Sequence, residues 1–191
     1  MKVTIIIASL LFALNLLAQN TIEIKCDSIY KGKGIQIKLE TFDDEKDGYD
    51  GEKNSILVIE QNLKNRKSVI IKDSIFSTVQ EIKFADFNND KIKDVLVQNI
   101  SDVRSNWTYY LYLYNPKTNS FKRVNGFEKI KKPKYNSIEN IIESYVVSGQ
   151  NWVGFYKIKN NIAVNLKIEI VNGENFERDY NKAIKRIKAK K

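Results

Sequence analysis

Apolar and polar residues alternate along most of the chain, and this pattern predicts strands. Between Gly34 and Glu40, the apolar residues Ile35, Ile37 and Leu39 take every second position. A period of two places the apolar and polar side chains on opposite faces of a half-buried strand. The same pattern, or a short apolar run, predicts further strands at 56–59, 68–72, 80–84, 94–99, 107–114, 120–124, 141–147, 152–158 and 162–171.

The aromatic-rich segment 107–114 has the strongest strand pattern, with Tyr110, Tyr112 and Tyr114 on one face. Strands at short spacing with polar turns predict an all-β, mainly antiparallel fold, either a β-sandwich or a propeller-like sheet fold. Apolar residues then recur at helical spacing near the C-terminus. They predict a short helix with a basic outer face, or a basic tail, over about 175–191.

The first 18 residues have the layout of a secretory signal peptide, with Lys2, an apolar run from Val3 to Leu17 and the small residue Ala18. The run of ~15 residues is shorter than the ~20 that span a bilayer. We therefore expect a signal peptide at 1–18, a single β-rich domain at 19–191 and a periplasmic or secreted protein. No transmembrane span is expected after cleavage.

Composition removes several classes of function. The 191 residues include no histidine and one cysteine, Cys26, and the formal charge is +9. Histidine-based triads and metal sites, zinc sites of several cysteines and internal disulfides are therefore excluded. The basic excess indicates an anionic partner or surface. Nucleic acid is not expected, because the protein is predicted to be exported and has no recognised nucleic-acid motif.

One segment carries the oxygen pattern of a calcium loop. Asp86, Asn88, Asp90 and Asp94 occupy positions 1, 3, 5 and 9, and Ile92 occupies position 7, where a backbone carbonyl serves as ligand. Calcium is a hard cation that takes six to eight oxygen ligands. We expect these residues to bind a calcium ion that stabilises the junction between two strands.

Two positions separate this loop from an EF-hand. The sixth residue is Lys91 where glycine is usual, and the twelfth is Val97 where an EF-hand has glutamate. A non-glycine residue in the left-handed region costs roughly 1–2 kcal/mol. A metal-free turn rich in Asp and Asn stays open as the alternative. Whether the second acidic stretch, Asp43 to Glu52, holds another ion is also open; such runs are usually solvated loops.

The segment from Asp86 to Asp94, followed by an apolar strand, resembles the loops of integrin-type repeat proteins. It is also similar to loops in secreted bacterial β-proteins related to I-type lysozyme inhibitors, some of which act as immunity proteins against peptidoglycan-degrading toxins. This second resemblance covers roughly residues 80–171 and includes the aromatic strand and turn from Leu113 to Thr118, then Phe121. It implies a β-fold that inhibits a wall-degrading enzyme.

Lysozyme inhibitors of this kind carry a Ser-Gly-x-x-Tyr loop that enters the enzyme cleft. The similar segment here begins with Ser148 and Gly149 and ends in Trp152 in place of tyrosine. The resemblance implies that these three residues contact a partner. A large rigid aromatic side chain at a turn suits such a contact, although aromatic residues are equally common in cores.

These observations favour a calcium-binding exported protein that acts by binding and is not an enzyme. Its expected partner is a peptidoglycan hydrolase or a cell-wall polymer. Two alternatives stay open. A cell-surface glycan or adhesion module would expose Tyr110, Tyr112 and Tyr114 as a row. A secreted carboxylate-dependent hydrolase would place two acids in a concave pocket within ~10 Å of each other.

Overall fold

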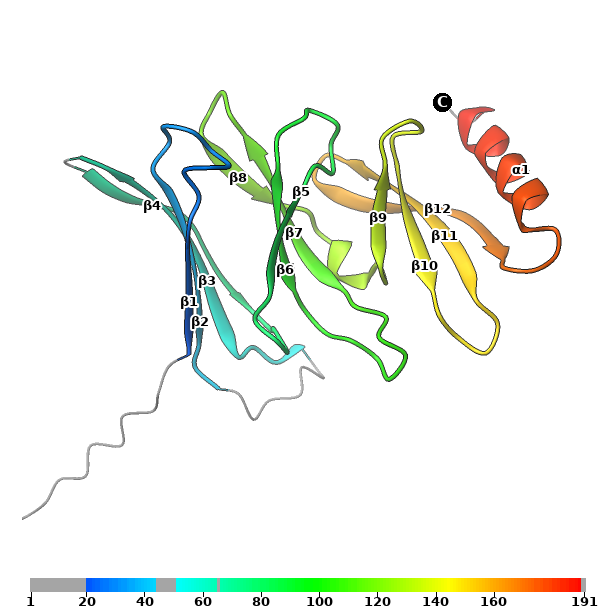
Figure 1. Cartoon of the computed structure of the whole chain (residues 1–191), viewed down its shortest axis with the longest axis horizontal. Helices are drawn as coiled ribbons and strands as arrows, with labels where there is room; N and C mark the ends of the chain where they lie inside the picture. Colours follow the sequence, from blue (N-terminus) through cyan, green and yellow to red (C-terminus); the bar gives the residue numbers. More distant parts are fainter. Residues whose placement is uncertain (1–19, 44–50, 65, 190–191) are drawn as a thin grey trace, which may run out of the picture.

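The computed structural model describes residues 20–43, 51–64 and 66–189. The predicted signal peptide and most of the acidic stretch from Asp43 to Glu52 lie outside these residues. Within them the chain forms three antiparallel sheets of four strands and a C-terminal helix (Figure 1). The all-β, mainly antiparallel fold expected from the sequence is thereby confirmed.

Each sheet is a meander in which consecutive strands are neighbours. The first sheet contains β1 (Thr21–Lys25), β2 (Ile35–Thr41), β3 (Ser55–Leu63) and β4 (Arg66–Ile75). The second contains β5 (Ile82–Ala85), β6 (Asp94–Gln98), β7 (Tyr109–Asn115) and β8 (Ser120–Arg123). The third contains β9 (Pro133–Asn136), β10 (Ile141–Val146), β11 (Trp152–Lys159) and β12 (Ile162–Val171). Serial four-stranded meanders are the units of propellers, so the propeller-like expectation describes this arrangement better than a two-sheet sandwich does.

The sheets lie side by side in chain order, with a hydrophobic core in each space between them (Figure 1). Tyr110, Tyr112 and Tyr114 on β7 face the first sheet, and Tyr109 and Leu111 face the third. The period-two pattern therefore assigned the faces of this strand correctly. Both faces are buried because the second sheet lies between the other two.

The outer faces of the first and third sheets are protected in different ways. On the outer face of the first sheet, Glu60 is only 3% exposed and pairs with Lys67 at 3.0 Å and Lys38 at 3.5 Å. Burial raises the pKa of Glu60, but hydrogen bonds from Lys67 and Asn62 and the charge of Lys38 outweigh burial and lower it. This polar network allows the outer face to remain in contact with water.

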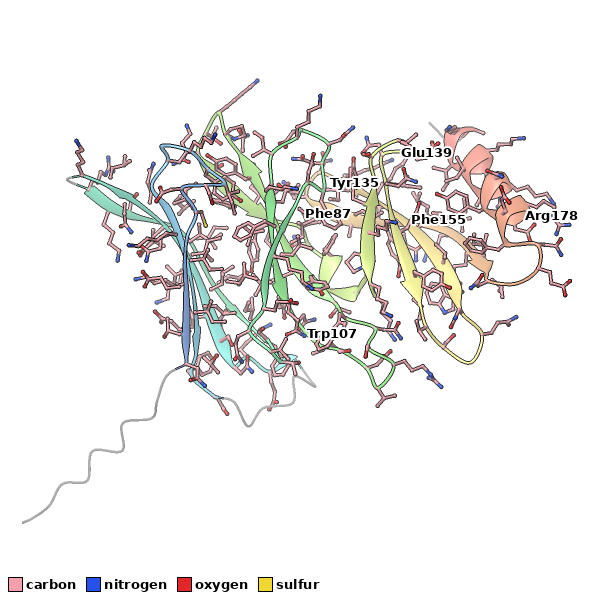
Figure 2. The ribbon with its side chains drawn as sticks, in the orientation of Figure 1. Phe87, Trp107, Tyr135, Glu139, Phe155 and Arg178 are labelled. Carbon is pink, nitrogen blue, oxygen red and sulfur yellow. The ribbon has the colours of Figure 1, made fainter. Side chains whose placement is uncertain are left out.

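The outer face of the third sheet is covered by the helix α1 (Phe176–Ala189). Ala183, Ile184 and Ile187 are buried against the sheet, and Phe155 on β11 stacks near Tyr180 with ring centroids 5.9 Å apart (Figure 2). The short C-terminal helix expected over about 175–191 is confirmed over Phe176–Ala189, in place of the alternative basic tail, and its basic residues lie on the solvent side. Within the described stretches, no helix is both long and apolar enough to cross a membrane.

Two strands and a short 3-10 helix were not predicted. β9 lacks an alternating pattern and forms an edge strand by pairing with the longer β10. β1 does alternate, with Ile22 and Ile24 between polar residues, and forms an edge strand beside β2; this pattern was overlooked. The 3-10 helix, η2 (Phe127–Lys129), follows β8. Its Phe127 is fully buried beside Phe87 in the second core. The pairing of β9 and the burial of Phe127 depend on distant partners in the fold.

Candidate functional site

The predicted calcium loop connects β5 to β6 at one end of the second sheet. Phe87 anchors it, with its ring edge-on to Phe127 at 5.2 Å and near Tyr135 of β9 at 5.9 Å (Figure 2). The loop is therefore held between the second and third sheets. Its polar tip, Asn88 to Lys91, is exposed to solvent.

The loop curls around the side chain of Asp86. One carboxylate oxygen accepts hydrogen bonds from the backbone N–H of Asn88 at 3.0 Å and of Asn89 at 2.7 Å. The other accepts from the N–H of Lys91 at 2.8 Å. Asn89 and Lys91 have φ of 64° and 66°. Lys91 thus adopts the left-handed conformation that glycine usually takes at the sixth position of a calcium loop.

Further along the loop, side-chain oxygens again accept hydrogen bonds from backbone N–H groups. The Asn88 side-chain oxygen Oδ1 accepts from the Asp90 N–H at 3.1 Å, and the Asp90 carboxylate accepts from the Ile92 N–H at 2.8 Å. The Asn88 side-chain amide also donates to Asp90 at 3.0 Å. The fold thus brings Asp86, Asn88 and Asp90 together in one tight turn.

Asp94 lies apart from this turn, in the interior of the protein. Its side chain is fully buried, and its two carboxylate oxygens accept from the backbone N–H of Phe87 at 2.8 Å and of Tyr114 at 3.0 Å. Asp94 therefore ties the loop to β7, a strand whose link to the loop was not visible in the sequence. The pKa of this carboxyl is raised to about 7, chiefly by burial; the two N–H groups oppose the rise, and the nearby charges of Asp90 and Asp86 add to it.

The carboxylates of Asp86, Asp90 and Asp94 make no ion pair with any lysine or arginine of the described stretches. Across the same stretches, no group of three or more His, Cys, Asp or Glu side chains gathers as metal ligands. The predicted ligands therefore share one loop, with Asp86, Asn88 and Asp90 in the turn and Asp94 directed to β7. The side chain of Ile92 packs against the first core.

The predicted partner-binding residues lie in the tight turn between β10 and β11. The Ser148 N–H donates to the Asn151 side chain at 3.0 Å, and the Ser148 hydroxyl donates to the Gln150 carbonyl. Just before the turn, the Asn106 side chain bonds both the N–H and the C=O of Val147, at 2.9 and 2.8 Å. The turn is therefore held rigidly at its base.

Within this turn Gly149 and Gln150 are exposed, whereas Trp152 is half-buried. The Trp152 ring lies over Gly154, where an added Cβ would come 3.0 Å from Trp152 Cζ3. Trp152 is not among the residues of the three hydrophobic cores of the described chain. The tip of the turn is made by Ser148, Gly149 and Gln150.

The tyrosines of β7 and the single cysteine lie in the interior of the protein. Tyr110, Tyr112 and Tyr114 are all buried, so the exposed row needed for the adhesion alternative is absent from β7. Tyr112 donates to Asp73 of β4 at 2.7 Å, and Arg123 of β8 bonds the same carboxylate at 2.9 Å, so these residues join the first two sheets. Cys26 is buried directly after β1, and burial raises its thiol pKa to about 11.

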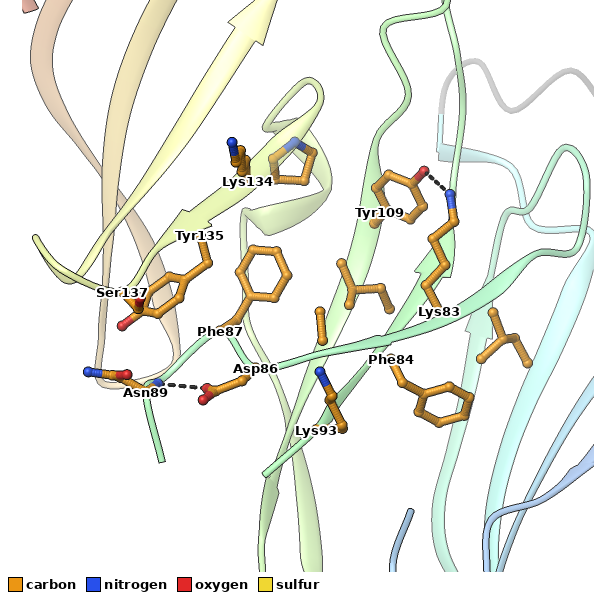
Figure 3. Close-up of a pocket in the computed structure, with 14 residues that line it drawn as sticks. Lys83, Phe84, Asp86, Phe87, Asn89, Lys93, Tyr109, Lys134, Tyr135 and Ser137 are labelled. Atoms are coloured by element: carbon orange, nitrogen blue, oxygen red, sulfur yellow. Dashed lines mark hydrogen bonds between the residues drawn. The ribbon is translucent and has the colours of Figure 1, made fainter. Parts of the chain in front are cut away.

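Three hollows surround the loop, with volumes of about 980, 520 and 220 Å³. The largest lies between β5 and β9 (Figure 3) and was not predicted. Asp86 is the one carboxylate among the residues that line it, and Asp90 is the one that lines the hollow of 520 Å³. None of these three hollows is therefore lined by the pair of acids that the hydrolase alternative requires.

Comparisons with known proteins identify no family. No family model matches the chain, and no curated protein matches it. Among solved structures, the chain is similar to one described as "Structure of a Xanthomonas Type IV Secretion System related protein", with 17% sequence identity and a TM-score of 0.46. The match covers 78% of this chain and 81% of that chain.

Proposed function

We propose that this chain is an exported protein that binds calcium through the β5–β6 loop and acts by binding and inhibiting a lysozyme-like peptidoglycan hydrolase. The observation that carries the calcium part is a set of three carboxylates that make no ion pair within the described residues. Asp86, Asp90 and the fully buried Asp94 lie in one loop without ion pairs to the described lysines and arginines, in a protein of formal charge +9. A divalent cation would balance the negative charge of these carboxylates.

The donor chemistry of the loop suits calcium. Asp86, Asn88, Asp90 and Asp94 offer hard oxygen atoms, and the backbone already takes the left-handed turn at Lys91 that such loops need. Each carboxylate oxygen has two lone pairs, so an N–H bond leaves capacity for a cation. The ion would neutralise the acids and stabilise the junction of β5 and β6; it would have no catalytic role.

Calcium is expected to raise the melting temperature of the mature protein by roughly 5 °C or more at an ion concentration far above Kd. Asp90→Ala should abolish this rise, because Asp90 is an exposed ligand whose loss removes few other contacts. Differential scanning calorimetry in calcium and in chelator measures the effect. Asp102→Ala is the matched control, since Asp102 is another loop carboxylate but is compensated by Lys131 at 2.9 Å. An equal calcium response in both variants would contradict the proposal.

The inhibitory part is supported by the shape of the β10–β11 turn. Asn106 and Asn151 fix its backbone, so little conformational entropy would be lost on binding. Its tip offers Ser148, Gly149 and Gln150 to a cleft, with the partly exposed Trp152 ring beside them. A protruding rigid turn can fill an enzyme cleft without performing chemistry.

Gly149→Arg is expected to weaken inhibition at least roughly tenfold, because a bulky side chain at the tip would clash with the walls of a cleft. A Cβ at Gly149 meets no atom within 4 Å, so folding should be unaffected. Gly173→Arg is the control, since its Cβ also meets nothing within 4 Å. The measurement is peptidoglycan turnover by a panel of purified lysozymes that includes an invertebrate-type enzyme. If no enzyme is inhibited, or both variants inhibit as the parent does, the inhibitory proposal is wrong.

A further inference from the structure

The largest of the three hollows around the β5–β6 loop is a groove between the edges of two sheets. It has a volume of about 980 Å³ and lies between β5, an edge strand of the second sheet, and β9, an edge strand of the third (Figure 3). Its apolar lining includes Phe84, Leu96 and Pro133. The β5–β6 loop contributes Asp86, Phe87, Asn89 and Lys93 to its lining, and the β10–β11 turn contributes no residue.

Lysines from three separate elements line the groove: Lys83 on β5, Lys93 just before β6 and Lys134 on β9. Lys83 is held in place by the Tyr109 hydroxyl at 3.0 Å and by Glu81 at 2.8 Å. Lys93 and Lys134 are exposed and make no ion pair with any residue of 20–43, 51–64 or 66–189. The groove is therefore a site for negatively charged groups.

The one carboxylate among the lining residues opposes this charge weakly. Both oxygens of Asp86 already accept backbone N–H bonds within its own loop, from Asn88, Asn89 and Lys91. The three lysines of the lining also outnumber this single carboxylate. An anion that enters near Lys93 and Lys134 therefore meets a net positive environment.

The edge of β5 also offers main-chain hydrogen-bonding groups. Glu81 and Gln98 face each other, and the Gln98 N–H donates to the Glu81 carbonyl at 2.8 Å. In an antiparallel pair the bonded positions alternate, so Lys83 bonds with β6 while the main-chain groups of Ile82 and Phe84 point to the outer edge. β9 is a poorer template, because Pro133 at its start has no N–H.

We propose that the groove binds an extended acidic segment of a partner protein, which adds to the edge of β5 as a further strand. Main-chain bonds to Ile82 and Phe84 would give affinity, and acidic side chains would meet Lys93 and Lys134. The aromatic side chains in the lining favour a peptide over an anionic saccharide. Phe87 and Tyr109 are buried and Phe84 and Tyr135 half-buried, so none presents an open ring on which a sugar could stack.

The first test measures the anisotropy of a labelled short peptide of alternating valine and glutamate at physiological salt. Saturable binding is expected, and the double variant Lys93→Glu/Lys134→Glu should weaken it roughly tenfold. Lys182→Glu/Lys185→Glu is the matched control, because it makes the same charge change on the outer side of α1. Absence of saturable binding, or equal loss in both double variants, would overturn the proposal.

The second test separates strand addition from simple charge attraction. A peptide of the same sequence, N-methylated at alternate residues, keeps every charge but loses main-chain donors; it should bind much more weakly. Amide hydrogen exchange of Ile82 and Phe84 should slow when the parent peptide binds. Equal affinity of the methylated peptide, or equal competition by polygalacturonate, would show that the site recognises charge alone and overturn the inference.

The groove and the proposed calcium site share Asp86, but the substitutions that test the two proposals are at different residues. Asp90, whose substitution tests the calcium site, is not among the residues that line the groove, and neither is Gly149. All groove measurements use one fixed calcium concentration. Failure of the groove proposal would therefore leave the proposed function untouched, and the reverse also holds.

Discussion

Asp94→Ala is expected to lower the free energy of unfolding by about 2–6 kcal/mol, since it leaves two buried backbone N–H groups without an acceptor at about 1–3 kcal/mol each. These are the N–H groups of Phe87 and Tyr114, which Asp94 bonds at 2.8 and 3.0 Å. Because the two belong to the loop and to β7, the variant should also loosen the loop. Urea denaturation monitored by tryptophan fluorescence measures the loss.

Asp90→Ala serves as the control for this variant, because Asp90 is exposed and bonds the backbone only at Ile92. We expect it to cost well under 1 kcal/mol in chelator, as most exposed substitutions do. If the two variants were equally stable, the hydrogen bonds by which Asp94 joins the loop to β7 would not contribute to stability as the structure indicates.

Asp94 also predicts how stability depends on pH when divalent cations are absent. Its folded-state pKa of about 7 lies above the unfolded value, so the folded protein keeps a proton that the unfolded chain releases. Stability should therefore fall as pH rises from about 4 to about 7, by at most about 1.4 kcal/mol per pH unit. Asp94→Asn, which does not titrate, should lack this fall. A parallel pH profile in the variant would contradict the assignment.

Ending the chain after Gly173, and so removing α1, is expected to cost about 5 kcal/mol or more, because two buried isoleucines are each worth roughly 1.5–3 kcal/mol and the partly buried Phe176 and Tyr180 add to this. Ala183 contributes less than this range, but Ile184 and Ile187 are close to fully buried. The exposed sheet face would include Ile141, Phe155 and Ile168. Increased binding of an apolar dye and a lower urea midpoint are the measurements.

A full-length variant in which Lys182 and Lys185 are replaced by alanine separates burial from charge. It removes basic side chains from the helix but leaves Ala183, Ile184 and Ile187 against the third sheet. Its stability should stay within about 0.5 kcal/mol of the parent. An unchanged urea midpoint in the truncated protein would show that the third sheet is stable without its helical cover.

The sequence located the calcium-type loop but not all of the roles within it. Asp86, Asn88 and Asp90 curl into one turn, as their spacing predicted. Asp94 matches the ligand pattern equally well, yet it also binds the N–H of Tyr114, 20 residues further along the chain. A local pattern carries no information about which distant strand supplies such a partner.

The groove between β5 and β9 could not be predicted from the sequence either. Lys83, Lys93 and Lys134 belong to three elements, and β9 is a strand because it pairs with β10 and not because of its own pattern. Nothing in the order of these residues indicates that they face one hollow. Likewise, the three sheets repeat one topology without a visible repeat in the sequence.

The sequence by itself determined the strand faces, the all-β class, the amphipathic C-terminal helix and the place of the acidic loop, because periodicity and turn chemistry are local properties. Only the tertiary structure decided that both faces of β7 are buried and that Asp94 joins the loop to a distant strand. It also decided that the edges of β5 and β9 enclose a basic groove. These features depend on how whole sheets pack against each other, and packing between sheets is set by the sum of many distant contacts.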